Sequence, residues 1–200
     1  MRLPLRRIAP AALALLLLPA TSHAHLVNTG LGPFYDGVSH FALTPEDLLP
    51  ALAIALLAGQ RGSRAGRLTL FALSAAWLAG GLVGLAFPSI SSATALTTLS
   101  FLALGGLVAG EAPLRAEWVS GPSLALGLLH GYLNGSAMSQ AKLGTLGLVG
   151  IVATLFVTVA LAAALVVALR ASWARVAVRV AGSWIVAIGL LLLGWSLRGA

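Results

Sequence analysis

The chain has 200 residues, of which 59% are hydrophobic and only 8% charged, and its mean hydropathy is +0.99. Soluble domains carry roughly 25% charged residues, so this composition excludes an ordinary soluble protein and indicates a multi-pass membrane protein. The formal net charge is +7, but the arginines lie in short clusters between apolar segments. Such clusters are typical of topology signals, so we expect a lipid bilayer and no nucleic acid as partner. The absence of cysteine excludes disulfides, thiolate metal sites and thiol catalysis.

Residues 1–24 have the three parts of a secretory signal peptide. A basic start precedes an apolar run at 11–18, and Ser22-His23-Ala24 forms a small-x-small cleavage site. Cleavage after Ala24 would make His25 the first residue of the mature chain. The alternative is an uncleaved first helix, which the short apolar run disfavours.

The remainder, residues 25–200, is predicted to be an all-α transmembrane domain. Gly30, Gly32, Pro33 and Gly37 are turn formers, so the polar stretch 25–41 is expected to be an extramembrane loop, and 25–44 a periplasmic entry segment. Six apolar segments follow it, each read as a membrane span. They cover residues 45–59, 68–87, 93–110, 119–138, 146–169 and 180–197.

The loops between these spans predict their orientation. Arginines follow the first span at 61, 64 and 67, and the fifth at 170, 175 and 179, which makes both loops cytoplasmic by the positive-inside rule. Six spans then place both termini of the mature chain in the periplasm. The expected location is the bacterial inner membrane, with multiple passes.

The first span begins with a polar cluster. Thr44 is a good helix N-cap, and Glu46 and Asp47 suit the first turn, where acids complement the helix dipole. Capping does not explain His40, nor why the helix begins so late: 45–59 spans only about 22 Å. A short helix of this kind indicates a site, because irregular backbone at membrane depth is tolerated where it lines a cavity or is buried in protein.

The fourth span carries a second polar cluster. His130, Asn134 and Met138 fall at i, i+4 and i+8 and so share one helix face. An ionisable group at membrane depth is costly unless it is paired or faces a cavity, which marks His130 as a candidate functional residue. The alternative is a hydrogen-bonded packing histidine.

The two clusters lie at compatible depths, toward the outer ends of their spans, and are predicted to converge. Imidazole and carboxylate ligands suit a divalent transition metal such as nickel, although ligand affinity alone favours copper over nickel or zinc. The predicted metal residues are His40, Glu46, Asp47, His130, Asn134, Met138 and His25.

These clusters resemble two motifs of the HupE/UreJ family. The segment His40-x5-Glu46-Asp47-Leu48-Leu49 resembles a first-span motif His-x5-Asp-His-Leu-Leu, and 130–135 resembles a fourth-span motif His-Gly-x-x-His-Gly. The resemblance implies a secondary permease for nickel, with cobalt, copper or zinc as other cargoes. It also implies hydrogenase or urease maturation proteins as partners, and no tightly bound cofactor.

The chain departs from these motifs in ways that bear on the cargo. Glu46 stands at the family's aspartate, Asp47 at its second histidine, and Asn134 at the second histidine of the fourth span. Losing two imidazoles shifts the predicted site toward oxygen ligands. His25 compensates if cleavage occurs after Ala24, because it then offers both its ring and its α-amino group.

Two other functions were weighed against transport. A non-transporting accessory subunit in metalloenzyme maturation would use the polar groups only to satisfy one another. An intramembrane serine protease of the rhomboid type is disfavoured, because such a protease has its histidine base on a span after the serine, and no histidine follows His130. His130 itself could not serve as the base for Ser136, because six residues at 100° per residue place the two on roughly opposite faces of the helix. The chain is therefore expected not to be an enzyme.

Overall fold

The computed structural model describes residues 28–89 and 94–198, and the regular elements in these ranges are all helices. The predicted signal peptide and His25 lie outside the described residues. In chain order the helices are α2 (Pro33–Leu43), α3 (Pro45–Gln60), α4 (Ser63–Ala86), α5 (Thr94–Ala109), α6 (Ala116–Gln140), α7 (Gly144–Ala168) and α8 (Ser172–Arg198).

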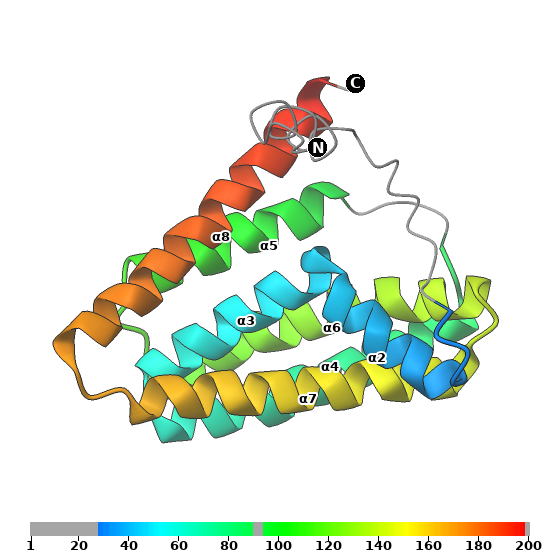
Figure 1. Cartoon of the computed structure of the whole chain (residues 1–200), viewed down its shortest axis with the longest axis horizontal. Coiled ribbons are helices and arrows are strands. Elements are labelled where there is room, and N and C mark those ends of the chain that lie inside the picture. Colours follow the sequence, from blue (N-terminus) through cyan, green and yellow to red (C-terminus); the bar gives the residue numbers. More distant parts are fainter. Residues whose placement is uncertain (1–27, 90–93, 199–200) are drawn as a thin grey trace, which may run out of the picture.

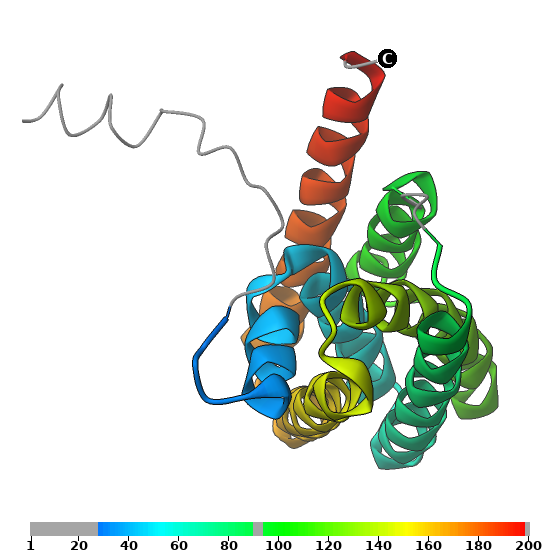
Figure 2. The ribbon, with the colours of Figure 1, turned by 90° about the vertical axis from the view of Figure 1, so that its right-hand side faces the viewer.

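The helices form a packed body and a diverging pair. In the body, α4 packs along α6, and α7 packs against α2, α3 and α4. The pair consists of α5 and α8, which pack on each other and meet the body mainly through α3. Figure 2 shows both helices of the pair rising away from the body. Helix α3 therefore lies between the two parts of the fold.

Each of the six predicted spans coincides with a helix, from α3 to α8. Helices α4, α7 and α8 are long and apolar enough to cross a membrane, and α2 with α3 forms a fourth candidate, bent by 71°. Helix α5 is apolar but shorter. Helix α6 has 25 residues, and its apolar character is diluted by the polar residues of the second cluster. The chain is thus an all-helical protein with the character of a membrane protein.

The loop predicted over residues 25–41 is wrong where the structure describes it, because α2 begins at Pro33. Proline suits the first turn of a helix, and Asp36 accepts hydrogen bonds from the Thr29 backbone N–H (2.7 Å) and hydroxyl (2.6 Å), which fix the entering chain. Gly37 is a packing residue rather than a turn former. A Cβ there would lie 2.0 Å from the carbonyl oxygen of Gly147, so its absence lets α2 contact α7.

Glycines also bring α4 and α6 into backbone contact. A Cβ on Gly131 would lie 2.2 Å from the Trp77 carbonyl oxygen, and one on Gly135 would lie 2.0 Å from that of Gly81. Small residues at such positions let helices approach closely. This contact fixes the rotation of α6 and hence the direction of His130.

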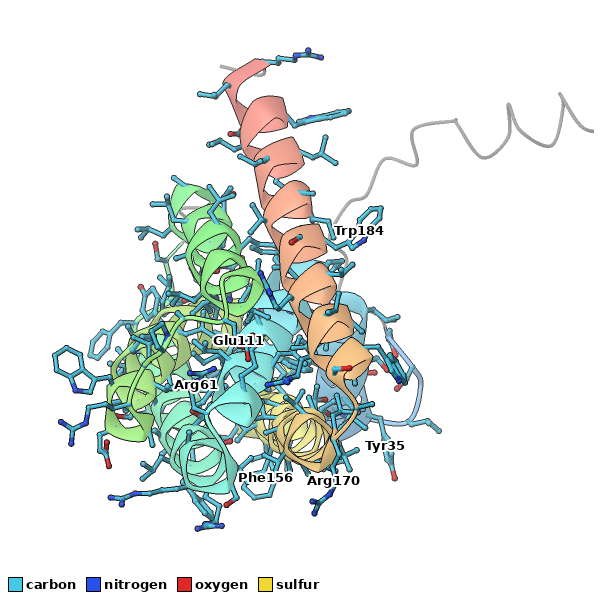
Figure 3. All side chains as sticks on the ribbon, turned by 90° about the vertical axis from the view of Figure 1, so that its left-hand side faces the viewer. Tyr35, Arg61, Glu111, Phe156, Arg170 and Trp184 are labelled. Atoms are coloured by element: carbon cyan, nitrogen blue, oxygen red, sulfur yellow. The ribbon has the colours of Figure 1, made fainter. Side chains whose placement is uncertain are left out.

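The predicted alternation of the loops is consistent with the fold. The end of the molecule where α3, α5 and α7 finish and α4, α6 and α8 begin carries most arginines of the described chain. Lys142 lies at the opposite end, between α6 and α7. Figure 3 looks onto the arginine-rich end, where the Arg61 guanidinium lies 3.9 Å from the Glu111 carboxylate. The positive-inside rule predicts that this end faces the cytoplasm.

Candidate functional site

The two polar clusters meet in the interior. The Nδ1 atom of His130, on α6, lies 2.8 Å from Oδ1 of Asp47, on the first turn of α3. The His130 side chain is fully buried and Asp47 is 5% exposed. Since an ionised carboxylate can only accept, the His130 Nδ1–H donates this bond. The predicted convergence of the first and fourth spans is therefore present in the fold.

Asn134 completes the pairing of the Asp47 carboxylate. Its Nδ2 amide donates to Oδ2 of Asp47 (2.9 Å) and to the backbone carbonyl of His130 one turn earlier (2.9 Å). Both carboxylate oxygens thus accept a hydrogen bond from α6, which offsets part of the cost of burying the charge. The Asn134 Oδ1 atom is buried and has no hydrogen-bond partner among the described residues.

The capping role predicted for Thr44 is wrong. Thr44 occupies the N-cap position of α3, but its side chain makes no capping hydrogen bond, and its extended backbone separates α2 from α3. The Asp47 and Leu48 N–H groups donate to its carbonyl oxygen instead (3.1 and 3.0 Å). The Asp47 side chain is instead turned into the bundle toward α6, where His130 and Asn134 donate to it.

His40 approaches the same carboxylate from α2. The 71° bend between α2 and α3 brings its Nε2 atom to 3.9 Å from Oδ2 of Asp47. The His40 side chain is 17% exposed, so it lies between the buried pair and the outside of the fold. Glu46 is exposed, and its side chain is not part of the buried cluster.

Met138 is buried elsewhere on α6. It lies two turns beyond His130, about 12 Å along the helix axis, and its sulfur lies 2.7 Å from the position that a Cβ on Gly147 would occupy. This methionine packs against α7. Of the predicted metal residues, the structure therefore gathers His40, Asp47, His130 and Asn134, and separates Glu46 and Met138 from them; His25 lies outside the described residues.

Two neighbours of His130 were missed by the sequence analysis. The Trp77 ring of α4 lies 5.5 Å from the His130 ring, centroid to centroid, with an interplanar angle of 33°. Ser100, on α5, has its Oγ atom 3.5 Å from Nε2 of His130, and it also donates to the Thr97 carbonyl oxygen (2.6 Å). Trp77 could have been noticed from the sequence, because it lies in mid-span, away from the interfaces where indoles usually anchor. Ser100 could not, because a single serine on an apolar helix is not a signal of function.

The chemistry of this cluster follows from its geometry. In residues 28–89 and 94–198, no three His, Cys, Asp or Glu side chains are arranged to hold a metal ion. Each oxygen of the Asp47 carboxylate accepts one hydrogen bond, whereas the Nε2 atom of His130 has, among the described residues, a single marginal contact at 3.5 Å with the Ser100 hydroxyl. A histidine whose other nitrogen donates to a carboxylate is the usual arrangement of a metal-ligating imidazole.

Comparison with protein families gives one result for the whole domain. The family model described as HupE / UreJ protein matches residues 13–192. The chain belongs to the HupE/UreJ family. Comparison with curated proteins and with solved structures found no match.

Membership of the HupE/UreJ family confirms the resemblance drawn from the two motifs. The family match covers all seven described helices except the last turns of α8. This HupE/UreJ protein is a membrane protein of a permease and accessory family linked to nickel and cobalt uptake or maturation. The buried Asp47–His130–Asn134 cluster lies where its two motifs meet.

Proposed function

We propose that this protein is a secondary permease for a divalent transition metal, with nickel as the favoured cargo, and that the cargo passes the Asp47–His130 pair. The observation that supports the proposal most strongly is the burial of a hydrogen-bonded carboxylate and imidazole at the junction of α3 and α6. Ionisable groups at membrane depth typically mark ion pathways or relays. The family match supports the cargo class.

The direction of the His130 ring supports a role in ligating the cargo. Asp47 holds Nδ1, so Nε2 points to Ser100 and α5. An apolar crevice of about 270 Å³ lies between α5 and α6 and is bordered by Ser100. Because α5 belongs to the diverging pair, a small outward movement of α5 would open this crevice to Nε2. His40, half-buried on the other side of Asp47, then supplies a second imidazole toward the outer end.

The described chain offers no third strong ligand, which suits a transported ion better than a resident one. Tight structural sites use three or four protein ligands, whereas a permease must release its cargo. With only the two imidazoles of His40 and His130 available among the described residues, transient binding of nickel, cobalt or zinc is expected, and Asn134 stabilises the empty state by holding Asp47.

One contact favours a second candidate function, an intramembrane hydrolase. Ser100, His130 and Asp47 are connected in the order of a Ser-His-Asp triad, with distances of 3.5 and 2.8 Å. Acyl-transfer chemistry also requires donors for the oxyanion. The backbone N–H groups around Ser100 lie within helix α5 and are used by the helix, so we favour transport. Ser136, the nucleophile weighed from the sequence, instead accepts a hydrogen bond from the Ser89 N–H (3.3 Å).

The test is metal uptake in cells that lack other nickel importers, comparing the wild type with His130→Ala and His40→Ala at equal membrane abundance. We expect strong loss of uptake for His130→Ala and partial loss for His40→Ala. Wild-type uptake in both variants would refute the site, and no uptake of any metal by the wild type would favour the accessory role. Covalent labelling of the wild type but not of Ser100→Ala by a fluorophosphonate would favour the hydrolase.

A further inference from the structure

A groove lies between α4 and α7, at the arginine-rich end and away from the Asp47–His130 cluster. Its volume is about 430 Å³. We call it the α4–α7 groove. Its lining includes Gly66, Arg67 and Leu70 of α4, Ala160, Ala164 and Ala168 of α7, and Arg170 beyond α7.

The walls of the α4–α7 groove are apolar and made of small side chains. The floor of the groove is narrow at Gly66, where a Cβ would lie 3.5 Å from that of Ala163. Along α7 the groove runs from Ala160 to Ala168, which is about 12 Å at 1.5 Å per residue. One leaflet of hydrocarbon is roughly 15 Å thick, half of ~30 Å, so the groove has the length of an acyl chain within a single leaflet.

An aromatic pair lies just beyond the deep end of the groove. The rings of Phe71 and Phe156 are 6.1 Å apart, centroid to centroid, in an edge-to-face arrangement. They link α4 to α7 one residue beyond Leu70 and one turn before Ala160. The groove is thereby bounded toward the membrane centre and remains open at its arginine-rich end.

The rim of the groove carries positive charge. Arg67 and Arg170 are the charged residues among the described residues that line it, and neither makes an ion pair there. By contrast, the neighbouring Arg64 is paired with Glu117 at 3.0 Å. Figure 3, which looks onto this end, labels Arg170 just beyond the end of α7 and Phe156 on α7.

We propose that the α4–α7 groove binds an anionic phospholipid of the cytoplasmic leaflet, with its phosphate between Arg67 and Arg170 and one acyl chain along the small residues of α7. A cationic rim above an apolar groove in a bilayer matches a molecule with a negative headgroup and a hydrocarbon tail. Basic pockets between membrane helices on the cytoplasmic side commonly recognise such headgroups. The lipid fills the groove and holds the ends of α4 and α7 together.

The experiment measures lipid binding to the purified full-length protein in detergent. Native mass spectrometry would count bound phosphatidylglycerol, with phosphatidylcholine and inorganic phosphate as comparison ligands. We expect retention of phosphatidylglycerol, at least tenfold weaker retention of phosphatidylcholine, and no binding of inorganic phosphate at the same concentration. Equal retention of both lipids would refute recognition of the headgroup by the arginines. Binding of inorganic phosphate without binding of phosphatidylglycerol would refute a lipid as the ligand.

Three variants test the contacts with the headgroup and with the acyl chain separately. The double variant Arg67→Gln, Arg170→Gln is expected to weaken phosphatidylglycerol binding by about tenfold or more. Ala164→Phe, which fills the groove without changing charge, is expected to weaken it similarly. The control Arg115→Gln removes one charge at the same end from a side chain that is 82% exposed and outside the groove, and it should bind as the wild type does. Unchanged binding in both test variants, or equal loss in the control, would refute the proposal.

Discussion

The His130 Nδ1 atom and the Asp47 Oδ1 atom lie 2.8 Å apart, although 83 positions separate the two residues in the chain. This hydrogen bond joins the start of α3 to the middle of α6 and leaves Nε2 of His130 directed at α5. A buried acid that accepts a hydrogen bond from one imidazole nitrogen fixes the orientation of the ring and leaves the other nitrogen able to bind a metal.

Two adjacent acids on α3 should differ in their contribution to uptake. Asp47→Asn places an amide donor opposite two existing donors, those of His130 and Asn134, so we expect uptake to fall by about tenfold or more. Glu46→Gln changes an exposed side chain and should keep most of the wild-type rate. The measurement is initial nickel uptake at equal membrane abundance. Equal loss in both variants would mean that Glu46, as the motif alone suggests, belongs to the metal path.

Restoring the motif at position 134 should strengthen metal binding. Asn134→His returns the second imidazole that the fourth-span motif of the HupE/UreJ family contains, on the same face of α6 and one turn from His130. An added nitrogen ligand favours nickel over harder ions, and we expect the half-saturating nickel concentration to fall by about tenfold. Asn134→Leu, the control of similar size, removes the donor to Asp47 and should weaken uptake. A higher half-saturating concentration in Asn134→His would count against a cargo path beside Asn134.

The close contact of α4 and α6 should be sensitive to a single methyl group. In Gly135→Ala the new Cβ would lie 2.0 Å from the Gly81 carbonyl oxygen, and we expect overpacking to cost about 1–3 kcal/mol of stability. Gly121→Ala is a matched control on the same helix, since nothing lies within 4 Å of its Cβ position. Thermal denaturation in detergent should show a lower midpoint for Gly135→Ala only. The same midpoint in both variants would show that the helices separate at no cost.

The orientation of the chain can be tested by thiol labelling because the native sequence has no cysteine. Lys142→Cys, between α6 and α7, should react with a membrane-impermeant maleimide added to intact spheroplasts. Ser172→Cys, at the start of α8, should react only after permeabilisation. The reverse pattern would place the arginine-rich end in the periplasm and contradict the positive-inside assignment.

Much of the architecture was predictable from local patterns, because each apolar segment is long enough to specify its helix by itself. The positions of α3 to α8 followed from hydropathy. The position of helix α2 did not, because a glycine such as Gly37 can either form a turn or allow a second helix to approach closely. Only the contact with Gly147 on α7 decides between them.

The polar residues of the site could be identified from the sequence, but the role of each one could not. Periodicity placed His130 and Asn134 on one face of α6 and matched their depth to Asp47. It did not distinguish Asp47, which turns inward, from Glu46, which is exposed, because both suit a first helical turn equally well. Ser100 and Trp77 were invisible for a different reason: they reach His130 only through the packing of α5 and α4, which no local pattern encodes.

The proposed path for divalent metal passes the Asp47–His130 pair. The most direct measurement is the influx of nickel into proteoliposomes containing purified protein and an entrapped metal-sensitive dye, which removes every other cellular transporter and partner. We expect saturable influx for the wild type, little above protein-free liposomes for His130→Ala, and near-wild-type influx for Glu46→Gln. Influx in His130→Ala at the wild-type rate, with the protein folded and present in equal amount, would contradict the account.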